Sequence, residues 1–239
     1  MKVVYQMHRK ALAMIELIFA IVIMGLALMS APMLISQAKI GGLSVVQQEA
    51  IAACATEVGM IMTRAWDEAD TNESDNGPIL VVQEDIAALN ENGTTGKRIG
   101  IPQPASRGFL TSDGRRLNAS SIANEDVNEY DDIDDFDGKT TTLNSESTTS
   151  TEEGDYIDNS LQMVTTVNYI KTTTTDDTYT STTVNFNSPF SNGSTTTTNV
   201  KAISTNVTSG SHSDVLDTNI TLKAFMCNIG TYTLETRTF

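Results

Sequence analysis

The chain has 239 residues, with 15 basic residues against 30 acidic ones and a net charge of -15. This length fits one domain of ordinary size plus an anchor or stalk, and it is too short for two large globular domains. Phosphate binding requires a basic surface, and the only basic cluster is Lys2, Arg9 and Lys10 at the start of the chain. Nucleic acid is therefore not an expected partner.

The first element in the chain is an apolar segment from Leu17 to Ile35 that contains no charged residue. As a helix rising ~1.5 Å per residue it spans roughly 29 Å, which matches the hydrocarbon core of a bilayer. It is long for the apolar region of a secretory signal. Because basic residues precede it, we expect a cytoplasmic N-terminus and export of everything after Ile35.

Glu16 lies directly before this apolar segment. An acidic side chain at the centre of a membrane helix costs ~2.5–3.5 kcal/mol, so a retained carboxylate usually has a function and a partner. Alternatively, Glu16 lies near the membrane edge, where the cost is small. The chemistry of the residue alone leaves both interpretations open.

The string RKALAMIELIF, from Arg9 to Phe19, resembles the prepilin leader junction of type IV pilins and type II secretion pseudopilins. In that family a short basic leader ends in a small residue, and the mature chain carries Glu at its fifth position. The resemblance places the cleaved bond between Ala11 and Leu12 and makes Glu16 the fifth residue. This chain has Ala11 where the family has Gly and Leu12 where the family has Phe.

The resemblance implies a mode of processing and assembly. Prepilin peptidase would remove residues 1–11, including the basic Arg9 and Lys10, and would methylate the new N-terminus at Leu12. Glu16 would pair with the N-terminal amine of a neighbouring subunit. The implied partners are other pilin or pseudopilin subunits, prepilin peptidase, the membrane and an inner-membrane assembly platform. The protein would cross the inner membrane once, with a periplasmic head, and then enter an extracytoplasmic filament.

The rest of the sequence predicts an α+β fold of pilin-like type, with a long N-terminal helix packed on a C-terminal antiparallel sheet. Residues 12–35 form the transmembrane half of that helix, and residues 36–69 form an amphipathic half with apolar residues at mostly helical spacing. We expect the helix to run from about Leu12 to Asp67 and Trp66 to pack against the head. Residues 70–239 form the head.

Within the head, short strands are expected between Pro78 and Leu117, where apolar runs alternate with Gly and Pro. Beyond Leu161, alternation of Val, Ile, Tyr or Phe with Thr predicts longer strands with one face on the helix and one in water. These strands are Val164–Ile170, Thr178–Phe186, Thr198–Val207 and Ile220–Leu234.

Two features of the head are candidate sites. Cys54 and Cys227 form either one disulfide, which an oxidising compartment permits, or two separate buried thiols. The run YDDIDDFDG supplies carboxylates of the kind that calcium prefers, although its spacing does not match an EF-hand loop. A solvated acidic loop is the alternative. The candidate calcium ligands are Asp131, Asp132, Asp134, Asp135 and Asp137.

The sequence is therefore expected to encode a structural subunit, a minor pilin or pseudopilin, and not an enzyme. His212 is the only histidine beyond residue 11, and its near neighbours do not have the arrangement of a catalytic triad. The Asp-rich run also resembles a short stretch in minor pilins of the mannose-sensitive haemagglutinin pilus system. The alternatives are a membrane-anchored adhesin and a soluble binding domain released by cleavage after Ala38.

Overall fold

The computed structural model describes most of the chain. The described residues are 4–71, 77–92, 96–99, 101, 107–122, 129–144, 160–171, 182–183, 188, 190, 193–209 and 219–230. Residues Met1–Glu49 and Ala50–Phe239 form two separate compact units.

The helix α1 runs from Val4 to Ile61 and passes through Pro32 without a break. Pro32 removes one backbone donor from the hydrogen-bond ladder of this helix. The helix ends six residues before the predicted Asp67. Thr63 N donates to Met60 O and Arg64 N donates to Ile61 O, so the last turn tightens and the chain leaves the helical path.

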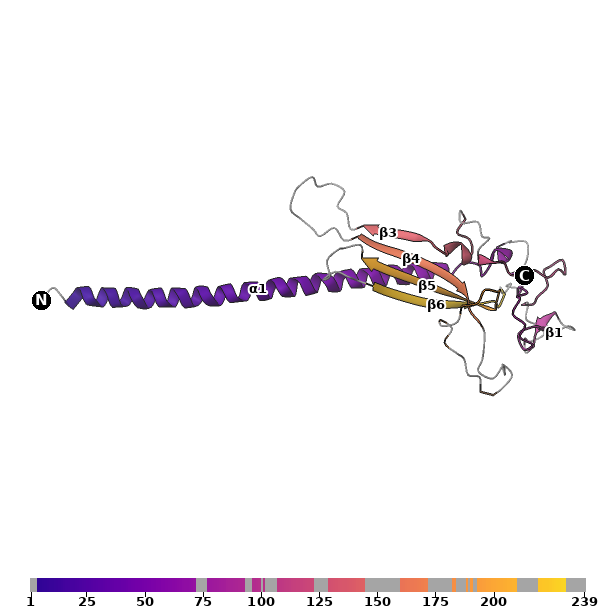
Figure 1. Ribbon diagram of the computed structural model, residues 1–239, viewed down its shortest axis with the longest axis horizontal. Coiled ribbons are helices and arrows are strands. Elements are labelled where there is room, and N and C mark those ends of the chain that lie inside the picture. The colour runs from indigo at the N-terminus through magenta and orange to yellow at the C-terminus, as the bar shows by residue number, and fades with distance from the viewer. Residues whose placement is uncertain are drawn as a thin grey trace, which may run out of the picture. The chain divides into compact units, whose positions relative to one another are not determined.

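Four antiparallel strands form the main sheet in the order β3-β4-β5-β6 (Figure 1). Three of them coincide with predicted strands, and β3 was not predicted. Most of the predicted strand Thr178–Phe186 lies outside the described residues. The α+β fold is therefore confirmed. The strands are β3 at Thr140–Asn144, β4 at Ser160–Tyr169, β5 at Val200–Ser209 and β6 at Asn219–Cys227.

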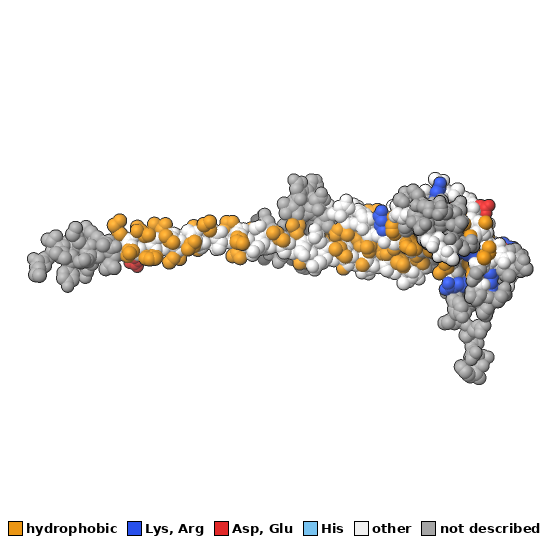
Figure 2. All heavy atoms as spheres, turned by 90° about the horizontal axis from the view of Figure 1, so that it is seen from below, with side chains coloured by type: hydrophobic (Ala, Val, Ile, Leu, Met, Phe, Trp, Pro, Cys, Tyr) orange, Lys and Arg blue, Asp and Glu red, His pale blue; other side chains and the backbone are white. Residues whose placement is uncertain are grey.

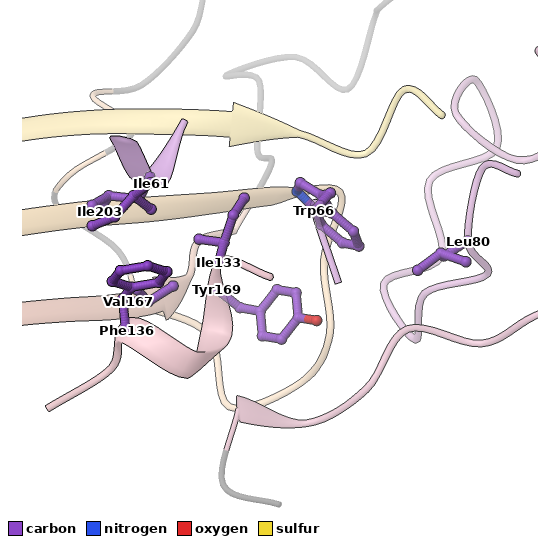
Figure 3. Close-up of a cluster of buried hydrophobic side chains, with 8 residues drawn as sticks. All are labelled: Ile61, Trp66, Leu80, Ile133, Phe136, Val167, Tyr169 and Ile203. Carbon is purple, nitrogen blue, oxygen red and sulfur yellow. The ribbon is translucent and has the colours of Figure 1, made fainter. Parts of the chain in front are cut away.

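One face of the sheet packs on the last turns of α1 within the unit Ala50–Phe239. Residues of β5 alternate between buried and half-buried, with Ile203 and Val207 fully buried. Ile61 of α1 joins Ile203 and Val167 of the sheet in one apolar cluster (Figure 3). The predicted arrangement, with one sheet face on the helix, is confirmed. Its period of two follows from side chains that alternate across a strand.

A short 3-10 helix, η1 at Glu68–Asp70, follows α1, and a second one, η3 at Asp134–Phe136, precedes β3. Ile133 lies directly before η3, and Phe136 is its last residue. Both side chains belong to the apolar cluster, as does that of Trp66 (Figure 3). The predicted packing of Trp66 against the head is confirmed, because its ring lies edge-on to that of Tyr169 with centroids 6.0 Å apart.

The predicted strands between Pro78 and Leu117 are mostly absent from the described residues of that region. Two strands of two residues each pair there, β1 at Glu91–Asn92 and β2 at Lys97–Arg98, and Val81 forms an isolated bridge with Asn118. Leu80 joins this loop to the main sheet: Asn228, just after β6, accepts from Leu80 N at 3.0 Å and donates to Leu80 O at 2.8 Å.

Candidate functional site

The residues of the prepilin-type motif all lie on α1. Arg9, Lys10, Ala11 and Leu12 belong to its first turns, and their side chains lie outside the described set. Glu16 is exposed on the same helix. No hydrogen bond or ion pair within the described part of the chain involves Glu16, so its carboxylate is open to solvent or to another molecule.

The surface of α1 around Glu16 is apolar and uncovered. Its large hydrophobic side chains between Met14 and Ile40 are exposed by 51% at Val22 to 78% at Met29. Figure 2 shows these side chains along the helix. The helix contains one segment, Ala13–Ile61, that is long and apolar enough to cross a membrane, and none of its most apolar window is buried within the protein. Exposing this much apolar surface to water is unfavourable.

The aspartate run folds into a turn that is mostly buried, which rejects the solvated-loop alternative. Asp132, Asp134 and Asp135 are each at most 3% exposed. Asp132 Oδ1 accepts from Asp134 N at 2.7 Å and from Asp135 N at 3.2 Å. Asp135 Oδ2 accepts in return from the amides of Asp131 and Asp132. These carboxylates therefore stabilise the backbone conformation of the run.

The buried cation beside the aspartate run is a lysine side chain. Lys201, at the start of β5, is completely buried, and its Nζ donates to Asp134 Oδ2 at 2.5 Å and to Asp67 Oδ2 at 3.0 Å. The third proton of Nζ goes to Trp66 O at 2.7 Å. Nζ also lies 4.2 Å from the centroid of the Trp66 ring, a cation–π contact.

Asp67 accepts several hydrogen bonds beside this lysine. Its oxygens accept from the amides of Ala69 and Ser120, and from the hydroxyl of Tyr169 at 3.2 Å. Hydrogen bonds of this kind stabilise a carboxylate in a buried place. We name the group Asp67, Asp70, Asp132, Asp134 and Lys201 the lysine cluster.

The lysine cluster holds four carboxyl groups and one ammonium, so its charges do not balance. Burial raises the pKa of Asp70 and of Asp132 to about 7. Burial also raises the pKa of Asp134 to about 8, against the opposing effect of Lys201. One oxygen of each of these three side chains is buried without a hydrogen-bond partner in the described structure. A protonated carboxyl has less to lose by such burial than a carboxylate has.

The candidate calcium ligands do not converge on one point. In the part of the chain that the structure describes, no group of three or more His, Cys, Asp or Glu side chains is arranged to hold a metal ion. Asp137 faces a different partner, because its Oδ1 accepts from Val167 N at 2.8 Å. One oxygen each of Asp132, Asp134 and Asp135 is bound to backbone amides or to Lys201.

The two cysteines are both free, so the disulfide alternative is corrected. Cys54 is buried on α1, where its Sγ lies 4.0 Å from Thr205 O, whereas Cys227 is exposed opposite Val200. Along β5, Thr205 and Val200 are separated by roughly 17 Å at ~3.4 Å per residue. A disulfide requires Cα atoms within ~7 Å. The alternative of two buried thiols holds for Cys54 only.

An open hollow of about 370 Å³ lies beside the loop that carries Leu80. Its charged wall includes Glu91 and Arg116, which form a two-pronged ion pair at 2.6 and 2.7 Å. Because these opposite charges are already paired, they do not supply a free charge for a ligand.

Reasoning from the sequence missed Lys201 and Asp67. The signal for Lys201 is its register: it shares the parity of Ile203 and Val207 in β5, so it belongs to the inward face of an alternating strand. No comparable pattern marks Asp67, which is placed by the turn after α1.

No family model, curated protein or solved structure matches this chain. The architecture itself is pilin-like: a long apolar N-terminal helix whose last turns pack on a C-terminal antiparallel sheet.

Proposed function

We propose that this protein is a minor pilin or pseudopilin, a structural subunit of a type IV pilus or a type II secretion filament. The observation that carries the proposal is the uncovered apolar surface of α1 with a single acidic residue, Glu16, between Ala13 and Gln48. In this proposal the subunit is made as a prepilin, is cut between Ala11 and Leu12, is methylated and then polymerises through α1.

The chemistry of Glu16 supports assembly rather than simple anchoring. A carboxylate in an apolar environment is costly alone, but it stabilises a complex when a cation meets it there. Cleavage before Leu12 would create such a cation, an α-amino group on a neighbouring subunit. The pair would then fix the register of two apolar helices.

Two other functions use the same helix differently. A membrane-anchored adhesin would keep the complete N-terminus, and an exported soluble binding domain would begin near Lys39. Each alternative therefore predicts its own N-terminal residue, which makes the processed end of the chain the decisive measurement.

The test compares wild type with Glu16→Ala and with the control Glu49→Ala, which removes an exposed carboxylate outside the apolar segment of α1. Mass spectrometry of the N-terminus and the amount of subunit in sheared filaments are the two readouts. We expect N-methylated Leu12 in all three proteins. We expect at least a ~10-fold loss of filament entry in Glu16→Ala alone, the effect of ~1.4 kcal/mol of lost pairing.

An intact Met1, or a mature chain that begins at Lys39, contradicts the proposal and identifies the corresponding alternative. Correct processing together with unchanged filament entry of Glu16→Ala contradicts the assembly function of Glu16.

A further inference from the structure

The side chains of Lys201 and Asp134 are in direct contact. Nζ of Lys201 is 2.5 Å from Oδ2 of Asp134, and both side chains are 0% exposed. A nitrogen this near a carboxyl oxygen is also close to the carboxyl carbon, near the ~3–3.5 Å of reactive conformers. Asp67 lies on the other side of Nζ, at 3.0 Å. A nucleophile, an electrophile and a proton acceptor therefore meet at one point.

The surroundings of this contact exclude water. Trp66 and Tyr169 place their rings 4.2 and 5.0 Å from Nζ, and both side chains belong to the main apolar cluster (Figure 3). Without bulk water, an amide that forms here is protected from hydrolysis, and the reactants are held without competition from solvent.

The separated side chains are also an expensive arrangement. The buried ammonium of Lys201 has lost its hydration, and Asp134 Oδ1 is buried without a hydrogen-bond partner in the described structure. Joining the two groups would replace an ammonium and a carboxyl with one neutral amide. The ammonium charge would then be removed from the lysine cluster, and Asp67, which takes up a proton, would lose its charge as well.

We propose that Lys201 and Asp134 form an intramolecular isopeptide bond, an amide between Nζ and Cγ, with Asp67 as the proton acceptor. The modification links the start of β5 to η3 and does not depend on the function proposed above. The raised pKa of Asp134 supports this step, because a neutral carboxyl is the form that an amine attacks.

The reaction is a condensation that needs no other reagent. The Lys201 ammonium gives one proton to the Asp67 carboxylate, and the amine lone pair attacks Cγ of the protonated Asp134. The proton on Asp67 then passes to the departing hydroxyl, which leaves as water, while the nitrogen returns a second proton to Asp67. The C–O bond breaks, the C–N bond forms, no atom is oxidised, and Asp67 ends as a neutral acid.

The test is peptide mapping by mass spectrometry of the purified full-length protein in detergent, after protease digestion. We expect the peptides that contain Asp134 and Lys201 to be recovered as one joined species, lighter by one water molecule than their sum. Recovery of the two peptides separately at full mass, from folded protein, overturns the proposal.

Variants test which residues are needed to form this bond. Lys201→Arg keeps a cation but cannot form the amide, and Asp67→Asn keeps the packing but removes the proton acceptor; we expect neither to contain the joined peptide. The matched control is Asp132→Asn, a buried carboxyl of the same cluster that does not contact Nζ in the described hydrogen bonds, and it should retain the bond. Circular dichroism confirms folding, and a fully joined Asp67→Asn protein refutes the assigned function of Asp67.

Discussion

At Asp70 and Asp132, burial opposes ionisation, and this competition makes folding depend on pH. Both carboxyls have a pKa of about 7 in the folded protein, because burial disfavours their charged form. An Asp in an unfolded chain titrates near ~3.9. Between these values the folded state binds more protons than the unfolded state does, so the free energy of unfolding falls as pH rises.

We therefore expect the melting temperature to fall as the pH rises from about 4 to about 7, the window between the unfolded and the folded pKa of these groups. A fall of at least ~2–4 °C corresponds to ~1 kcal/mol in a chain of this size. Asp70→Asn and Asp132→Asn should each flatten the dependence in calorimetry or circular dichroism. Asp113→Asn, an exposed site, is the control and should leave the slope unchanged. A melting temperature that rises with pH would contradict this explanation.

The residues of the N-terminal motif are neighbours in the sequence, so the motif can be recognised there, and its cleavage and assembly functions stay predictions. The sequence did not predict the lysine cluster, since Asp67, Asp132 and Lys201 are distant in sequence and are brought together only by the fold. The aspartate run was recognised as unusual, yet its burial beside Lys201 was not predicted, because lysine lies mostly at protein surfaces.

At the scale of elements, long periodic patterns were predicted well and short ones were not. The strands β4, β5 and β6 follow the alternation of apolar residues with Thr, whereas β3 has the sequence TTTLN, with only Leu143 to mark a face. The segment after Pro78 is apolar enough for a strand, but Leu80 pairs with the side chain of Asn228 instead of with another strand.

The side chain of Asn228 links the end of β6 to the loop that carries Leu80. It is 1% exposed and bonds to both backbone groups of Leu80 as well as to Asn199. Asn228→Ala leaves the buried N–H and C=O of Leu80 without partners, at ~1–3 kcal/mol for each group. We expect a loss of ~2–5 kcal/mol in denaturant unfolding.

The control for this prediction is Asn206→Ala. Asn206 is also a strand-associated amide with two side-chain hydrogen bonds, to Asn219 and Thr221, but these lie on the exposed face. Its loss should cost no more than ~0.5–1.5 kcal/mol, the net value of an ordinary hydrogen bond. Equal losses of unfolding free energy in the two variants would contradict the proposed function of Asn228 as the link to Leu80.

At the scale of the whole molecule, the two compact units divide α1 near Glu49, so the head has a core of its own. We expect a chain shortened to begin at Lys39 to be soluble and to melt at the temperature of the full-length protein in detergent. A chain that begins at Val58 should be less stable by roughly 2–4 kcal/mol, because it loses the burial of Ala50 and Cys54 and the ion pair of Glu57 with Lys139. Equal melting of both shortened chains in calorimetry would contradict the boundary.

Trp66 gives the lysine cluster an optical signal. It is the only tryptophan in the chain, and its ring lies 4.2 Å from the nitrogen of Lys201. All tryptophan fluorescence of this protein therefore comes from one position, in contact with one charge. A change in the charge of that nitrogen would alter the emission of the whole molecule, so a fluorimeter can follow the state of Lys201 without any added label.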